Sequence, residues 1–131
     1  MAKTTAEQTN FTAYRIVEAV DVDVPSARTF NTKAGRQARK ALIMAARLLR
    51  IRTDNGGTQV NILEDAVTLA CASIRACEWI QEKSRDATER RRSERVELMA
   101  RALVAFAKAR FPDGSHANDT PLAYLKAAEK I

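Results

Sequence analysis

The chain has 131 residues, of which 46% are apolar and 29% are charged, values of a folded globular protein rather than a disordered segment. Its 22 Lys and Arg residues outnumber its 16 Asp and Glu residues, which gives a formal net charge of +6. No uncharged run approaches the ~18 residues that a membrane span needs, and the first residues show no apolar segment typical of a signal peptide. We therefore expect a cytoplasmic protein with no membrane partner.

The N-terminal part, residues 1–26, is expected to be an arm with a possible strand. Its first ten residues are polar. Apolar and acidic residues then alternate over residues 19–24, a pattern typical of a half-buried strand, which Pro25 would stop. A short helix over residues 12–19 is the competing interpretation.

A second part, residues 27–83, is predicted to form a basic core of two helices. After a short extended piece, Asn31 or Thr32 can cap a basic helix over residues 33–50. Residues 54–57, Asp-Asn-Gly-Gly, then force a turn. The following residues, 58–83, predict a long helix whose interior is apolar nearly all the way round, so it should be buried on several sides.

The third part, residues 84–131, is predicted to supply helices for packing or oligomerisation. Residues 85–110 carry an apolar seam at alternating spacings of three and four, formed by Val96, Met99, Leu103 and Phe106. A polar loop follows, and Thr120-Pro121 begins a last helix with Leu122 and Leu125 directed inward.

The expected fold class is therefore mainly α, a helical bundle with a short N-terminal β segment. Because residues 66–74 are apolar on more sides than one thin domain readily covers, we also expect a homodimer or a larger homo-oligomer.

The positive charge is concentrated between Val24 and Thr53, which contain eight basic residues and no Asp or Glu. At about 100° per residue, six of these residues fall within roughly one third of the circumference of the predicted basic helix, opposite an apolar side. Clustered cations attract polyanions by releasing counterions from a phosphate backbone. The six are Lys33, Arg36, Arg39, Lys40, Arg47 and Arg50.

Nucleic acid is the first partner that this pattern indicates, and duplex DNA is favoured over single strands because Phe30 is the only aromatic residue near the block. The alternative is a small helical adaptor or inhibitor that binds an acidic protein surface. The structural explanation, a solvated helix face that only aids solubility, also stays open, because charge signals are not specific.

Residues for catalysis, cofactors or metals are not apparent. His116 is the only histidine and is predicted to lie in a polar surface loop. Cys71 and Cys77 are six residues apart in an apolar helical stretch, so they point to different sides and are expected to be reduced core residues. Gly56-Gly57 lacks the Lys and Ser or Thr of a phosphate-binding loop. We expect no enzyme activity, cofactor or metal.

Residues 27–74 resemble the ribbon-helix-helix DNA-binding superfamily. The resemblance rests on the order of a short strand, a helix, a glycine turn and a second helix that opens with Gly57-Thr58, Ile62-Leu63, Glu64-Asp65 and Ala66-Val67. It implies that two chains pair residues 27–31 as an antiparallel ribbon in the major groove. It also implies that Arg28 reads bases and that the backbone amides at Thr58, Gln59 and Val60 hold a phosphate.

Overall fold

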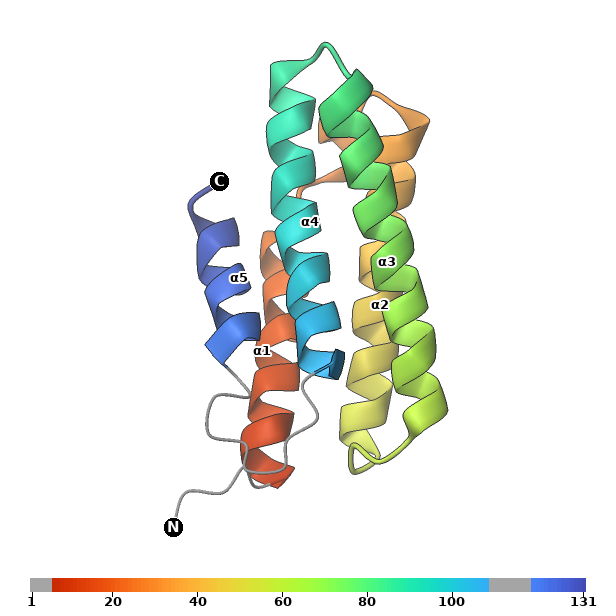
Figure 1. Cartoon of the computed structure of the whole chain (residues 1–131), viewed down its shortest axis with the longest axis vertical. Helices are drawn as coiled ribbons and strands as arrows, with labels where there is room; N and C mark the ends of the chain where they lie inside the picture. The colour runs from red at the N-terminus through yellow and green to blue at the C-terminus, as the bar shows by residue number, and fades with distance from the viewer. Residues whose placement is uncertain (1–5, 109–118) are drawn as a thin grey trace.

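The protein is an antiparallel helical bundle in a computed structural model that describes residues 6–108 and 119–131, with side chains from residue 11 to 108 and from 120 onward. Five α-helices and one 3-10 turn occur in these residues: α1 (Ala6–Asp23), η1 (Ala27–Thr29), α2 (Lys33–Asp54), α3 (Val60–Lys83), α4 (Ala87–Lys108) and α5 (Asp119–Glu129). Figure 1 shows α1 to α4 side by side with alternating direction, and α5 against α4 on the side away from α3.

The predicted helical bundle is confirmed, but the predicted N-terminal β segment is wrong, because the described residues contain no strand. Residues 19–24 belong mostly to α1, so the competing helical interpretation was correct. The side chains of α1 that are buried are Thr12, Ala13, Ile16, Val17 and Val20. Their spacing of three and four residues gives a helix one continuous apolar face, whereas a lone strand would leave its backbone groups without partners.

The ribbon of the ribbon-helix-helix resemblance is also absent from the described residues. Residues 27–29 form η1, whose N-cap Ser26 accepts the backbone amide hydrogen of Arg28 at 3.4 Å. Pairing of residues 27–31 with a second chain needs an extended backbone, which a 3-10 turn does not provide. The ribbon model is therefore wrong for this chain.

The helix α2 begins where the sequence predicts, because Thr32 caps it: the Thr32 hydroxyl accepts the backbone amide hydrogen of Gly35 at 3.0 Å. It ends four residues later than expected, at Asp54, and Gly56 and Gly57 follow with φ of 94° and 76°. Such left-handed angles strain any residue with a Cβ, which explains the glycine pair.

The core is shared by all four long helices. The largest fully buried apolar side chains are Ile16, Leu42, Leu49, Ile80, Met99, Leu103, Val20 and Val96. The α2–α3 contact is the most extensive, and the hydroxyl of Ser73 on α3 donates to the carbonyl oxygen of Ala38 on α2 at 2.8 Å. Small residues are common on the buried sides of these two helices, which lets their backbones approach.

The apolar interior of α3 is partly covered from within the chain. Ala66, Ala70 and Ser73 are buried, and the larger Val67, Leu69 and Ile74 are half-buried in the core cluster. Neighbouring α2 and α4 supply this cover. A homodimer stays a prediction, and α2 and α4 of the same chain cover part of the apolar stretch that suggested it.

Candidate nucleic-acid interface

The exposed side of α2 carries the cations that the sequence predicts. Its buried side is formed by Gly35, Ala38, Leu42, Ala45, Ala46, Leu49 and Thr53. Lys33, Arg36, Lys40 and Arg47 are exposed on the other side. These four project within about 60° of one another at 100° per residue, and the 14 residue steps from Lys33 to Arg47 span ~21 Å of helix.

Three of these four cations have no recorded side-chain partner among the described residues. Lys33, Lys40 and Arg47 form no ion pair there. Arg36 donates to the carbonyl oxygen of Phe30 at 3.3 Å and, within the described residues, pairs with no carboxylate. The face is therefore cationic and largely unneutralised over Lys33, Arg36, Lys40 and Arg47, which we call the α2 basic face.

The remaining two cations of the predicted set differ from these. Arg39 is half-buried and donates through Nε to the carbonyl oxygen of Pro25 at 2.8 Å, so it fastens the α1–α2 connection to α2. Arg50 is exposed and lies 4.0 Å from Asp21 and 3.9 Å from Asp54. Because these carboxylates reduce its net charge, the α2 basic face ends before Arg50.

Two apolar side chains lie on the same exposed side of α2. Met44 is 41% exposed and Ile51 is 48% exposed. At about 100° per residue they project beside Lys33 and Lys40. The exposed side of α2 therefore carries two apolar side chains among its basic ones.

Arg28 and Thr58 do not join this face as a single site. Arg28 is exposed on η1, before α2, and Thr58 is exposed after α2, two residues before α3 begins at Val60. The 22 residues of α2 separate them by roughly 33 Å. The two positions implied by the ribbon-helix-helix resemblance therefore lie at opposite ends of the helix.

Near Thr58, Gln59 contacts the residues that precede it rather than capping α3. Gln59 is the N-cap residue but makes no capping hydrogen bond with its side chain. Its carbonyl oxygen accepts from Nε of Arg52 at 3.2 Å, and its side-chain Nε2 donates to the Asn55 carbonyl at 3.0 Å. Partial burial lowers the pKa of Arg52. These contacts fasten the turn between α2 and α3.

The sequence also drew attention to the two cysteines and to His116. Cys71 is half-buried and Cys77 is buried, and both are free. Burial, with a smaller effect of Glu97, raises the pKa of the Cys77 thiol from 9.0 to about 12. No group of three or more metal-ligating side chains occurs in the described part of the chain, and His116 lies outside it. Within the same residues, no helix is both long and apolar enough to cross a bilayer.

The structure brings together one group of cations that the sequence analysis did not single out. Arg91, Arg92 and Arg95 line a pocket on α4 with Thr88. The sequence signal was their spacing of three, four and seven residues from Thr88, which places all four on one helix face. The mixed charges of the surrounding run obscured this signal.

Comparison with known proteins does not identify the chain. Neither the family models, nor the curated proteins, nor the solved structures contain a match to it. No relative therefore supports the ribbon-helix-helix resemblance, and the function is argued from the residues themselves.

Proposed function

We propose that the protein binds double-stranded nucleic acid through the α2 basic face. The observation that carries the proposal is the exposure of Lys33, Arg36, Lys40 and Arg47 on one side of a helix without carboxylate partners among the described residues. Lys and Arg side chains supply most protein contacts to phosphate oxygens, and such contacts fix a protein on a duplex.

The shape of the face favours a duplex over a single strand. α2 contains no aromatic residue on which unpaired bases could stack. A helix about 10–12 Å across matches the ~12 Å width of the major groove, and ~21 Å of cationic length spans several successive phosphates of either strand. Phosphate contacts therefore dominate the proposed binding, with Met44 available to contact a thymine methyl group.

The test is the binding of a short labelled DNA duplex at low salt, measured by fluorescence anisotropy. The variant Lys40→Glu with Arg47→Glu reverses two exposed charges of the face and should weaken binding at least about tenfold. The matched control is Arg75→Glu with Lys126→Glu, which changes the net charge equally at exposed positions on α3 and α5.

Binding that is lost in the α2 variant and retained in the control supports the proposal. Equal loss in both variants would indicate attraction by net charge alone, and no duplex binding by the native protein would overturn the proposal.

One observation favours a second candidate, an adaptor that binds an acidic protein surface. Met44 and Ile51 are exposed beside the cations, and apolar side chains of this size are typical of protein contacts rather than phosphate contacts. If this candidate is correct, a helical peptide with alternating Glu and Leu faces should bind more tightly than poly-glutamate. Met44→Ser with Ile51→Ser should remove that preference while leaving the salt dependence of duplex binding unchanged, because neither side chain contacts a phosphate.

A further inference from the structure

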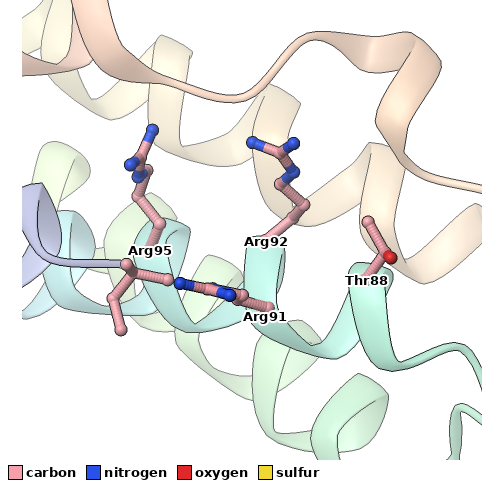
Figure 2. Close-up of a pocket in the computed structure, with 5 residues that line it drawn as sticks. Thr88, Arg91, Arg92 and Arg95 are labelled. Atoms are coloured by element: carbon pink, nitrogen blue, oxygen red, sulfur yellow. The ribbon is translucent and has the colours of Figure 1, made fainter.

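A pocket on α4 gathers three arginines at the end of the bundle where η1 lies. Thr88, Arg91, Arg92, Arg95 and Ile131 line it, and its volume is about 290 Å³. Figure 2 shows Arg92 and Arg95 extending from α4 on the same side as Thr88. A space of this size accommodates one tetrahedral anion with part of the molecule that carries it.

The arginines form no close ion pair within the described part of the chain. No carboxylate there lies within 4.0 Å of a guanidinium nitrogen of Arg91, Arg92 or Arg95, although Glu94 is adjacent on the same helix and Ile131, the last residue, lines the pocket. The buried Glu89, one turn away, is engaged by Asn31 and Thr32 instead. Three like charges around one pocket repel one another, and a bound anion would relieve that repulsion.

Two of the three arginines are partly buried, which distinguishes them from a run of fully solvated charges. Arg92 and Arg95 are half-buried, unlike the exposed Arg85 and Arg91. Packing of these two side chains against the helix restricts their motion, and an anion in the pocket can accept hydrogen bonds from both guanidinium groups. Thr88 adds a hydroxyl that can donate to an anion oxygen.

The packing of the bundle explains why the arginines converge at this position. The same face of α4 continues along the helix as Met99, Ala102 and Phe106, which are buried. Both α1 and α5 contact α4, and Figure 1 shows α4 continuing past the ends of both helices. The face is apolar where these helices cover it and basic where they stop, so a recess remains beside the arginines.

We propose that this pocket binds a phosphate group carrying two negative charges, either a free phosphate ester or the phosphorylated end of a nucleic-acid strand. A planar guanidinium group can bind two phosphate oxygens with parallel hydrogen bonds. Three guanidinium groups offer more donors than the two oxygens of a carboxylate can accept, and a phosphate has more oxygens to accept them. The pocket is on α4, whereas the proposed duplex interface is on α2, so either proposal can fail without the other.

Calorimetric titration with inorganic phosphate and with pyrophosphate in chloride buffer tests the proposal. Arg92→Gln and Arg95→Gln should each weaken binding about tenfold or more, as loss of a charge-assisted hydrogen bond does. Arg85→Gln removes the same charge from an exposed position outside the pocket and should bind like the native protein.

A second measurement separates lost binding from lost folding. At a phosphate concentration well above the dissociation constant, the native melting temperature should rise by roughly 3–6 °C, and Arg92→Gln should show no rise. Without phosphate, Arg92→Gln should melt at or above the native temperature, because one repulsive charge is removed.

The two sources of phosphate are distinguished with a short single-stranded oligonucleotide, with and without a 5′-phosphate. Tighter binding of the phosphorylated oligonucleotide than of pyrophosphate, lost in Arg92→Gln, supports a strand end. Equal binding of both oligonucleotides together with tight pyrophosphate binding supports a free ester. If phosphate, pyrophosphate and the 5′-phosphate all bind the native protein and Arg92→Gln equally, or none binds, the proposal is overturned.

Discussion

Glu89 on α4 accepts the backbone amide hydrogen of Asn31 at 3.0 Å, and so joins the start of α4 to the residues just before α2. The hydroxyl of Thr32 donates to the other oxygen of the same carboxylate. Glu89 is fully buried. Asp86 extends the joint, because its carboxylate accepts from the Asn31 side chain at 2.9 Å and from the Thr88 amide at 2.9 Å. This joint holds the α2 basic face relative to the α4 pocket.

Replacing Glu89 should therefore destabilise the protein. In Glu89→Ala, the Asn31 amide and the Thr32 hydroxyl lose a charged acceptor in a buried site, which should cost about 2–4 kcal/mol in the free energy of unfolding. Glu89→Gln retains one acceptor oxygen and should cost less. Urea denaturation measures both values, and a Glu89→Ala variant as stable as the native protein would contradict the assigned role.

Gly35 is required because Phe30 packs against it. A Cβ at position 35 would lie 2.6 Å from Cδ1 and 2.9 Å from Cβ of Phe30, closer than real Cβ contacts. Gly35→Ala should therefore destabilise the protein by about 1–2 kcal/mol, even though alanine is the better helix former by about 1 kcal/mol. In a Phe30→Gly background, which removes both contacting atoms, the same change should become neutral or stabilising. If Gly35→Ala stabilises the native protein, the close packing is not as described.

The two cysteines should differ in reactivity. Burial raises the pKa of Cys77 to about 12, so its thiol is almost entirely protonated at neutral pH and shielded from reagents. Iodoacetamide at mildly alkaline pH should modify half-buried Cys71 first and Cys77 only as fast as the protein opens. Mass spectrometry of peptides over time measures this order, and the Cys71→Ser variant isolates the rate at Cys77.

The same shift predicts a pH dependence of stability. The pKa of Cys77 is raised from 9.0 to about 12 in the folded protein, so its contribution is fully present below pH 9 and is lost as the pH rises toward 12. The difference in unfolding free energy between native and Cys77→Ala should therefore be constant below pH 9 and shrink above it. If this free-energy difference instead grows as the pH rises above 9, the pKa of Cys77 is not raised in the folded protein.

The helices were predictable where periodicity and capping agree. Thr32 follows Asn31 directly before the basic stretch, and the capping bond is the one that such a residue makes. In α1, the alternation of residues 19–24 was misleading because it is short. The longer pattern of Ala13, Ile16, Val17 and Val20 was the better guide, and Val22, which fits only the alternation, is 73% exposed.

The outcome at individual arginines was not predictable, because it depends on contacts between distant segments. Arg39 and Arg47 look alike in the sequence, yet Arg39 donates to Pro25 while Arg47 stays exposed without an ion pair among the described residues. Similarly, Arg92 and Arg95 line a recess because α4 continues past the ends of α1 and α5 (Figure 1). Helix periodicity gives a residue's side of the helix, but it does not give the length of neighbouring helices.

The salt dependence of duplex binding tests the central claim most directly. Each phosphate neutralised in B-DNA contributes about 0.9 to the slope of log affinity against log salt. Lys40→Gln with Arg47→Gln removes two exposed cations of the α2 basic face, so the magnitude of the slope should fall by about 1.8 relative to the native protein. An unchanged slope would show that these side chains do not contact phosphates and would contradict the assignment of α2 as the interface.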